Sequence, residues 1–381
     1  MVRWILIGIF VLSALLIFWT YIGYPFFIAL LARYRPRPHH RAPLELPVTF
    51  IIPAYNEEAV IREKLENILA LDYPTALREI IVITDGSTDR TMELVAAYAE
   101  MGVQLLYQPE RQGKIAAMNR AVPYAHGDIL VFSDANAIME LHSLRQILPN
   151  FSDPKVACVS GEKRIRPAAD VQAQGESAYW RYEAFMKRAD SLVSTAIGAV
   201  GEFFAIRREL YRPLETDNLI EDFVLAMRLV MDGWRVVYEP GAVTWEEASP
   251  SLLGEWRRRA RMAAGGFQAI GRLRGLLSPR YGLIAFQYVS HKVLRWLAPF
   301  FMLAAVFASA ALAAEPLFRV AFWGQAAFYL LAALGWLFEI WGWKFKPVRM
   351  IFYFCFANAT MLGGFVRYVT KTQSVLWTKA R

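Results

Sequence analysis

Cysteine is scarce in this chain of 381 residues, and two common phosphate-binding glycine motifs are missing. The two cysteines, Cys158 and Cys355, lie far apart, and Cys355 falls within an apolar stretch. We therefore expect no disulfide framework, and a reducing compartment for the central region. No Gly-x-Gly-x-x-Gly follows the first predicted strand, and Gly-x-x-x-x-Gly-Lys-Ser/Thr occurs nowhere. These absences argue against a Rossmann dinucleotide site and against a P-loop.

Charge is also missing from the N-terminal run between Trp4 and Ala32. That run exceeds the roughly 20 residues that cross a bilayer. It is too long and too aromatic for a cleaved signal peptide, so residues 1–33 are predicted to be a retained transmembrane anchor. The linker 34–46 is basic. By the positive-inside rule it places the following domain in the cytoplasm, on a multi-pass protein of the cell (inner) membrane.

A second apolar region begins near residue 278. Residues 278–295 are predicted to form an interfacial amphipathic helix, because apolar and basic positions alternate there at helical spacing. The alternative is a plain extension of the next span. Residues 296–381 are predicted to hold two or three spans, of which 296–314 and 317–343 form a hairpin.

The last apolar stretch, 350–366, leaves two alternatives open. If it crosses the membrane, the basic tail ends outside, against the positive-inside rule. Otherwise the stretch is re-entrant. The basic residues concerned are Arg367, Lys371, Lys379 and Arg381. A basic turn around Lys344 would precede this stretch on the cytoplasmic side.

The net charge is +8, from 42 Lys and Arg against 34 Asp and Glu. These basic residues cluster beside hydrophobic runs, as flanking charges of membrane segments do. We therefore expect the lipid bilayer as a partner and no nucleic acid.

The central region, 47–277, alternates short apolar runs with amphipathic stretches. Strands are predicted at 48–53, 79–84, 103–107 and 129–133, with helices between them and Asn56 as the first N-cap. This order predicts an α/β fold with a mainly parallel sheet. Ligands of such sheets bind beyond the carboxyl ends of the strands.

Polar residues follow three of these strands: Asn56-Glu57, Asp85, and Asp134-Ala135-Asn136. Each could be an ordinary polar turn. Their convergence on one sheet edge instead favours a ligand site. A metal held by Asp134, helped by the cation of Lys114, would hold phosphates there without a glycine-rich loop.

These motifs, in this order, resemble those of the membrane-anchored family 2 glycosyltransferases, which include cellulose, hyaluronan and poly-N-acetylglucosamine synthases. The resemblance covers about residues 47–377 and implies a GT-A nucleotide-sugar-binding domain flanked by transmembrane α-helices. "FIIPAYNEE" resembles the turn that frames the nucleotide base, "ITDGSTD" the contact with uracil or ribose, and "GKIAAMNRA" the element near the diphosphate. The residues so assigned are Ala54, Tyr55 and Glu57, then Asp85, then Lys114.

"SDANA" stands where the family carries Asp-x-Asp. The resemblance assigns Asp134 and Ala135 to nucleotide-sugar binding, and Asp134 and Asn136 to a metal, Mg²⁺ or Mn²⁺. Asn136 departs from the usual carboxylate, and an amide oxygen is a weaker ligand for a hard cation. Its place in the metal shell therefore stays open.

"GAVGEFFAIRREL" resembles the wall between donor sugar and acceptor, which assigns Gly201 and Glu202. "LIEDF" resembles the Glu-Asp motif, so Glu221 is placed in the site and Asp222 is the general base. The alternative is that both acids only favour the N-terminus of the following helix.

"EWRRRARMAAGG" stands where many processive members carry Gln-x-x-Arg-Trp. Arg258 occupies the Gln position, Arg261 the Arg position and Met262 the Trp position. The arginine expected at the diphosphate is kept, whereas the aromatic that stacks on the acceptor sugar is lost. For Arg257 and Arg259 a membrane-surface role is equally open.

The resemblance implies an inverting glycosyltransferase that moves a sugar from a nucleotide-sugar, expected to be UDP-linked, to a membrane-associated lipid or saccharide acceptor. A β-glycosidic bond would result. The alternatives are a processive polysaccharide synthase and a non-catalytic nucleotide-sugar sensor. A homo-oligomer or an export partner stays open.

Overall fold

The structure is a computed structural model that describes residues 1–166, 171–249, 251–343 and 345–376. Several residues used above lie outside this description: Lys344 of the basic turn, Trp377 at the end of the resemblance, and Lys379 and Arg381 of the tail.

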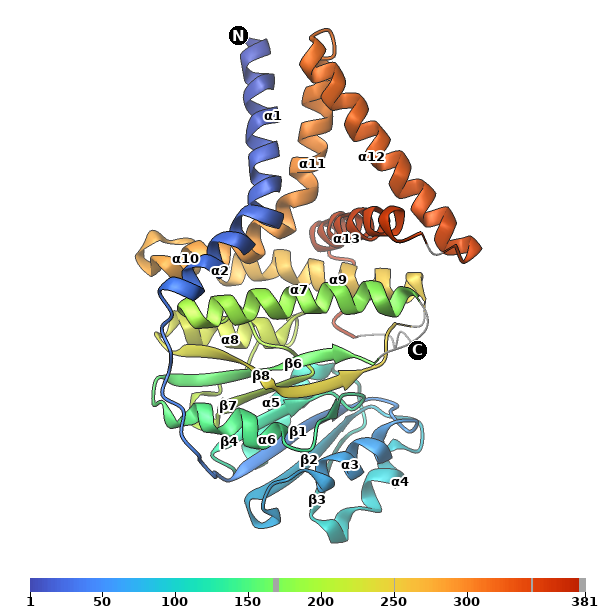
Figure 1. Cartoon of the computed structure of the whole chain (residues 1–381). Coiled ribbons are helices and arrows are strands. Elements are labelled where there is room, and N and C mark those ends of the chain that lie inside the picture. The colour runs from blue at the N-terminus through green and yellow to red at the C-terminus, as the bar shows by residue number, and fades with distance from the viewer. Residues whose placement is uncertain (167–170, 250, 344, 377–381) are drawn as a thin grey trace.

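The centre of the molecule is an eight-stranded sheet with the order β3-β2-β1-β4-β7-β6-β8-β5 (Figure 1). The first four strands pair in parallel, as predicted: β1 (Val48–Ala54), β2 (Arg78–Asp85), β3 (Val103–Gln108) and β4 (Ile129–Ser133). The later strands were not predicted: β5 (Ile138–Met139), β6 (Val156–Ile165), β7 (Phe203–Arg207) and β8 (Arg235–Glu246). β6 and β8 are parallel, whereas β7 and β5 run antiparallel to their neighbours.

Helices cover both faces of the sheet, because both faces of its strands are apolar. In β1, Ile51 belongs to one core cluster, whereas Phe50 and Ile52 belong to the other. This follows from side chains that alternate along a strand. One face carries α3 (Ile61–Ala70), α4 (Thr91–Ala96) and α6 (Ser143–Ile147); the other carries α5 (Lys114–Ala121), α8 (Glu221–Met231) and α9 (Leu252–Arg272).

Short 3₁₀ turns complete the domain: η2 (Thr75–Leu77), η3 (Ala99–Met101), η4 (Val122–Tyr124), η5 (Leu148–Ser152), η6 (Arg208–Leu210), η7 (Arg274–Leu277) and η8 (Pro279–Tyr281). Both cysteines are free, as predicted.

The prediction that Asn56 caps the first helix is wrong. α3 begins at Ile61, and Asn56 has a φ of 52°. Its side-chain oxygen instead accepts a hydrogen bond from Thr88 N at 2.7 Å. Asn56 thus joins the turn after β1 to the turn after β2, and Asn tolerates this left-handed conformation better than most residues.

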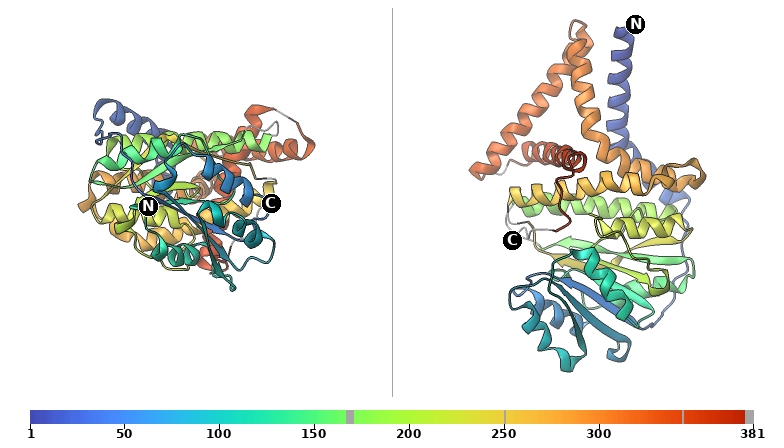
Figure 2. Two further views of the ribbon diagram at one scale, coloured as in Figure 1. Left: turned by 90° about the horizontal axis from the view of Figure 1, so that it is seen from below. Right: turned by 180° about the vertical axis from the view of Figure 1, so that it is seen from behind.

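Among the described residues, four helices are long and apolar enough to cross a membrane. The first, Val2–Tyr34, joins α1 (Val2–Phe18) to α2 (Tyr24–Tyr34) through a π turn, η1 (Trp19–Gly23). The second is Leu283–Ala311, and the others are α12 (Pro316–Trp341) and α13 (Lys346–Val369). α1 and α11 (Leu294–Ala311, the later part of the second span) rise together from the domain, and α12 returns toward it (Figures 1 and 2).

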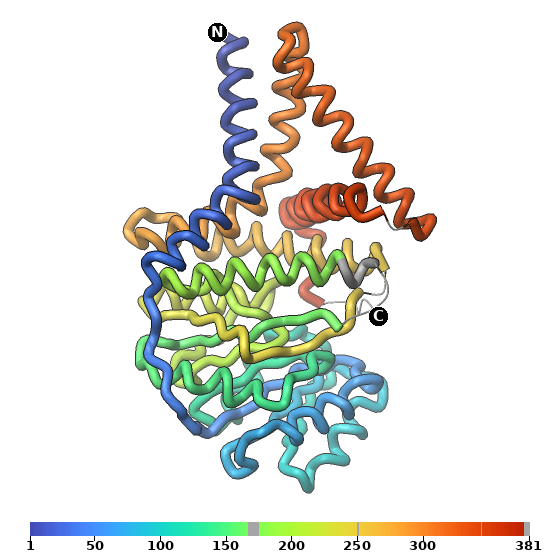
Figure 3. The backbone as a smooth tube through the Cα atoms, in the orientation of Figure 1, coloured from blue at the N-terminus to red at the C-terminus, as the bar shows by residue number. Residues whose placement is uncertain are grey.

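α13 does not run alongside the other long helices but lies across them, over α9 (Figures 1 and 3). Small residues permit this close crossing, since a Cβ at Gly364 would lie only 2.5 Å from Ala263 Cβ. The chain then turns back into the α/β domain, where Leu376 Cδ2 lies 3.8 Å from the position of a Cβ at Gly113. The described end of the chain is therefore on the side of the α/β domain.

Residues 283–311 form one continuous helix. α10 (Leu283–Tyr288) continues through a second π turn, η9 (Val289–Val293), into α11 (Leu294–Ala311). The polar face of this helix is buried against α7 (Val171–Val193): His291 Nδ1 lies 2.6 Å from Asp190 Oδ2, and Arg295 Nη1 lies 2.6 Å from Glu183 Oε2. These basic groups pair with acids of the protein, and an interfacial position of residues 278–295 stays a prediction.

Candidate active site

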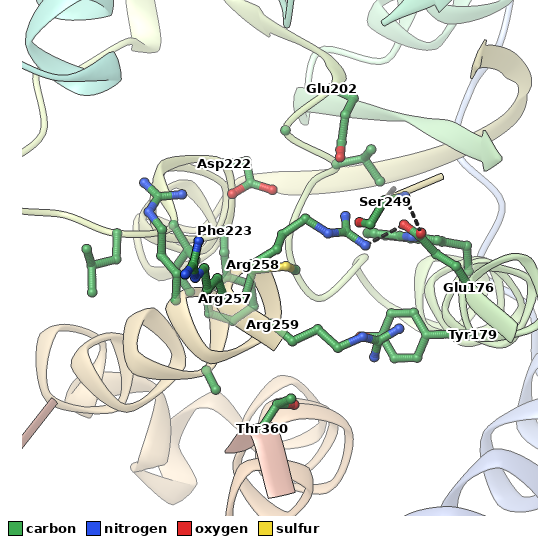
Figure 4. Close-up of a pocket in the computed structure, with 18 of the residues that line it drawn as sticks. Glu176, Tyr179, Glu202, Asp222, Phe223, Ser249, Arg257, Arg258, Arg259 and Thr360 are labelled. Atoms are coloured by element: carbon green, nitrogen blue, oxygen red, sulfur yellow. Dashed lines mark hydrogen bonds and ion pairs between the residues drawn. The ribbon is translucent and has the colours of Figure 1, made fainter. Parts of the chain in front are cut away.

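One cavity of about 810 Å³ lies between the sheet and four helices: α7, α9, α11 and α13. Its lining joins parts of the chain that are far apart in sequence (Figure 4). Ten predicted site residues line it: Glu57, Lys114, Asp134, Asn136, Gly201, Glu202, Glu221, Asp222, Arg258 and Arg261. Ala54, Tyr55, Asp85 and Ala135 are not among its lining residues.

Asp222 lies in the first turn of α8 and points into the cavity (Figure 4). Its carboxylate accepts no hydrogen bond from the described residues. Gly201 lies opposite this carboxylate and presents only backbone to it: a Cβ at Gly201 would lie 3.3 Å from Asp222 Oδ2. Burial, together with the charge of Glu221, raises the pKa of Asp222 to about 7, against the opposing effect of Lys187. A carboxyl group with this pKa is suited to take up a proton near neutral pH.

Lys114 joins two of the acids. Its Nζ lies 2.6 Å from Asp134 Oδ1 and 2.6 Å from Glu221 Oε1. Burial raises the pKa of Asp134 to about 6 even though Lys114 lowers it, and Glu202 raises it further. The single charge of Lys114 thus does not balance the negative charges around Asp134. A further cation bound beside Asp134 would be favourable.

Asp85 lies beneath this site, with its carboxylate buried. It accepts hydrogen bonds from Gly113 N at 2.6 Å and from Arg120 Nη2 at 2.8 Å, and also from Gln112 N. Asp85 therefore shapes the loop that presents Lys114 at the start of α5, a role that was not predicted. A nucleotide contact by Asp85 stays a prediction.

Ala54 ends β1 and Ala135 follows β4, and both side chains are buried. The ring of Tyr55 lies 3.5 Å from the guanidinium carbon of Arg111, in a cation–π contact. The predicted base-binding residues thus lie at the same sheet edge as the cavity but outside its lining.

A second set of ion pairs borders the cavity. The ammonium group of Lys163 lies 2.5 Å from Glu202 Oε1 and also contacts Glu246 Oε2. Although burial alone would raise it, this pairing lowers the pKa of Glu202 to about 2. Glu202 is therefore a fixed negative charge rather than a proton acceptor.

A family model described as "Glycosyltransferase like family 2" matches residues 46–265, more than half of the chain. The chain belongs to this family. The match ends within α9, so it covers the sheet, the acids and Arg261.

The curated relatives of this chain include poly-beta-1,6-N-acetyl-D-glucosamine synthases. That of Staphylococcus aureus (strain COL) is 31% identical over 229 residues, or 58% of this chain and 55% of the relative. That of Staphylococcus epidermidis is 26% identical over the same length. The chain thus spans about half the length of the curated relatives it matches.

A solved structure is similar over nearly the whole chain. It is the mannosyltransferase PcManGT from Pyrobaculum calidifontis in complex with GDP-Man and Mn²⁺. The identity is 26% and the TM-score 0.75, and the match covers 97% of this chain and 100% of that chain. The likeness includes the membrane-side helices, which the family model leaves out.

The basic run on α9 divides into two kinds of arginine. Arg258 pairs with Glu176 and donates to Glu255 Oε2 at 3.0 Å, and the guanidinium of Arg259 lies 4.3 Å from the ring of Tyr179 (Figure 4). Arg257 and Arg261 also line the cavity but form no ion pair with the described residues. Arg261 Nε is buried without a hydrogen-bond partner there. These two arginines are available to an anionic ligand, whereas Arg258 is already paired.

The residues present fit a divalent cation that is also bound by a diphosphate. Asp134 Oδ2 and Asn136 Oδ1 accept no hydrogen bond from the described residues, and both side chains line the cavity. No group of three or more His, Cys, Asp or Glu that could hold a metal occurs among the described residues. A site with one or two protein oxygens completed by phosphate oxygens is usual for Mg²⁺.

Several cavity residues were missed by sequence reasoning. Glu176, Tyr179, Glu183 and Lys187 face the cavity from α7. Their spacing of three and four residues along one helix was the signal that could have found them. Arg367 and Gln373 reach the cavity from α13 and the chain after it, and no local pattern pointed to them.

Proposed function

We propose that this protein is an inverting glycosyltransferase that transfers a sugar from a nucleotide-sugar to an acceptor presented at the membrane. The observation that carries the proposal is Asp222: an unpartnered carboxylate with a pKa near 7, in the same cavity as the cations that suit a diphosphate. The other acids around it, Asp134, Glu202 and Glu221, are each paired with a lysine, which supports a single displacement with Asp222 as the base.

In this reaction the acceptor hydroxyl gives its proton to Asp222 while its oxygen bonds to the anomeric carbon. The bond from that carbon to the phosphate oxygen breaks, and the nucleoside diphosphate leaves. Attack from the opposite side turns an α-linked donor into a β-linked product. Lys114 and Arg261 would stabilise the negative charge of the leaving diphosphate.

The proposed cofactor is Mg²⁺ or Mn²⁺, held by Asp134 and Asn136. When bound, such an ion neutralises charge on the diphosphate. The Mn²⁺ in the mannosyltransferase from Pyrobaculum calidifontis supports this proposal. The similar proteins point to different donor sugars: the mannosyltransferase holds GDP-Man, whereas the curated relatives are named as synthases of a polymer of N-acetyl-D-glucosamine. A UDP-linked donor is our proposal.

The proposed acceptor is membrane-associated, because residues of α11 and α13 line the same cavity as Asp222. We propose that α1, α11 and α12 span the cell (inner) membrane, with α13 at its cytoplasmic surface and the catalytic domain in the cytoplasm. This arrangement leaves Arg367 and Lys371 on the cytoplasmic side and satisfies the positive-inside rule.

A processive polysaccharide synthase is the second candidate, favoured by the names of the curated relatives. Single transfer is favoured by Met262, which lines the cavity where processive members carry a stacking tryptophan. Incubating native membranes with labelled UDP-, GDP- and dTDP-sugars and sizing the product would separate the two. A ladder of long chains would replace single transfer with polymerisation.

The test of the proposed base is Asp222→Asn. We expect kcat to fall by about 10²–10⁴-fold, the usual contribution of a general base, with donor affinity nearly unchanged. Asp217→Asn is the matched control, because Asp217 is an exposed acid whose one ion pair among the described residues is with Arg272. Transfer at the wild-type rate by Asp222→Asn would remove Asp222 from this role.

A further inference from the structure

The amide of Asn136 has a defined orientation. Its Nδ2 donates a hydrogen bond to Glu246 Oε1 at 2.5 Å. A carboxylate only accepts hydrogen bonds, so the amide nitrogen, not the oxygen, must face Glu246. The amide oxygen, Oδ1, consequently points away from Glu246. Asn136 and Glu246 line the same cavity as Asp134.

Glu246 is itself held in place. It ends β8, and its second oxygen contacts the ammonium group of Lys163, whose side chain is 0% exposed. The same ammonium lies 2.5 Å from Glu202 Oε1 and 4.5 Å from the ring of Trp180. Two carboxylates share this buried cation. The contact with Lys163 holds Glu246 Oε2, while Glu246 Oε1 faces Asn136.

A carboxylate at position 136 would face the carboxylate of Glu246, which is unfavourable. Two carboxylates at hydrogen-bonding distance repel each other, and one of them must take up a proton. The neutral amide avoids the repulsion and still offers an oxygen. Glu246 thus accounts physically for an asparagine where the family usually carries an aspartate.

We propose that Glu246 is a positioning residue that turns Asn136 Oδ1 toward the divalent cation, as the second protein ligand beside Asp134. The inference rests on the proposed function only for the presence of a metal-bound diphosphate. It adds Glu246, which lies outside the Asp-x-Asp position, and assigns the amide oxygen of Asn136 to the metal and the amide nitrogen to Glu246. Partners that orient metal ligands in this way commonly contribute tenfold or more to metal affinity.

The experiment measures Mn²⁺ binding to the full chain in detergent by electron paramagnetic resonance, with UDP and, in a second series, GDP. Glu246→Gln can donate as well as accept, so it no longer fixes the amide. We expect Mn²⁺ affinity to fall about tenfold. Glu247→Gln is the matched control, since Glu247 also lines the cavity but pairs with Arg166 instead. It should stay within about twofold of wild type.

A charge exchange makes the test specific. Asn136→Asp alone should weaken Mn²⁺ binding, because its carboxylate faces Glu246. The double variant Asn136→Asp/Glu246→Gln restores a hydrogen bond with donor and acceptor reversed, and should bind Mn²⁺ at least as tightly as wild type. If Glu246→Gln does not fold, the double variant decides alone, and Mn²⁺ binding tenfold weaker than wild type would overturn the proposal.

Two further results would overturn it: unchanged Mn²⁺ affinity in Glu246→Gln, or tighter binding by Asn136→Asp without the second change. Binding is measured without turnover. A wild-type protein that binds Mn²⁺ as described but transfers no sugar would therefore overturn the proposed function and leave this inference standing.

Discussion

The two walls of the cavity carry opposite charge. The acidic floor, built at the strand ends and the start of α8, consists of Asp134, Glu202, Glu221 and Asp222. The basic roof, on α9 and α13, consists of Arg257, Arg261 and Arg367, none of which forms an ion pair with the described residues. A metal-bound diphosphate carries charge of both signs and would lie between such walls. In the acidic floor, burial raises the pKa of Asp134 and Asp222, whereas, despite burial, lysine partners lower the pKa of Glu202 and Glu221. The basic roof leaves arginines without an ion pair and so available to a ligand.

The largest effect is expected from removing Lys114, the cation that pairs with both Asp134 and Glu221 in the acidic floor. Lys114→Met leaves Asp134 and Glu221 buried without a partner, and breaking such a pair costs about 3–5 kcal/mol of the free energy of unfolding. We expect a loss near the lower end, because part of the Asp134 carboxylate is exposed. Denaturant unfolding in detergent measures it.

Lys155→Met is the control for that variant, since Lys155 is exposed on the surface and its side chain forms no ion pair with the described residues. Its stability should stay within about 0.5 kcal/mol of wild type. Equal stability of Lys114→Met and wild type would contradict the view that Lys114 stabilises the buried acids Asp134 and Glu221.

The basic roof should matter for donor affinity more than for folding. Arg261→Ala removes a charged hydrogen-bond donor worth about 1.5–3 kcal/mol, so donor Kd should rise about tenfold to 150-fold. Arg274→Ala, an exposed arginine, is the control. Isothermal titration with the nucleoside diphosphate checks the change, and a nucleoside monophosphate should lose less. Equal losses for both nucleotides would place Arg261 away from the diphosphate.

The acidic floor also predicts a pH dependence. Burial raises the pKa of Asp222 to about 7, and only the ionised form can take a proton. Below pH 7 the rate of transfer should therefore fall about tenfold per pH unit, and above it the rate should level off. The pKa of Asp134, raised by burial to about 6, should add a loss of donor affinity at lower pH. A flat profile of kcat from pH 5.5 to 8.5 would contradict the role of Asp222.

The smallest effect concerns how α13 is held over α9. Gly364→Ala puts a Cβ 2.7 Å from Ala260 O, which should cost about 1–3 kcal/mol of stability and shift the roof slightly. Gly324→Ala is the control, because a Cβ there has nothing within 4 Å in the middle of α12. Thermal unfolding in detergent and donor Kd are the measurements. Unchanged stability of Gly364→Ala would show that α13 and α9 are not closely packed at this crossing.

Much of the fold could be predicted from local pattern. The four parallel strands were, because each is a short apolar run between amphipathic helices. β7 was not, since its antiparallel place between β4 and β6 depends on pairing between distant segments. Asn56 was wrongly predicted to cap a helix, because its side-chain oxygen instead accepts a hydrogen bond from Thr88 N, 32 residues further along the chain.

The candidate site divides in the same way. Asp134, Lys114 and Asp222 follow strands or begin helices, so motif and position pointed to them. Glu246 and Arg367 reach the cavity from the end of a late strand and from the last helix, with no local signal. The nucleotide contact predicted for Asp85 stays a prediction, and its hydrogen bonds from the backbone of Gly113 and Gln112 were not foreseeable.

The sequence by itself determined the apolar stretches long enough to cross a membrane, the parallel half of the sheet and the identity of the acids, because hydrophobic length, periodicity and residue type are local properties. Only the tertiary structure decided that α13 lies across α9, that the residues around Leu376 return to Gly113, and that Asn136 faces Glu246. These depend on which side chains meet across long stretches of chain, and packing and charge pairing settle that only once the whole chain has folded.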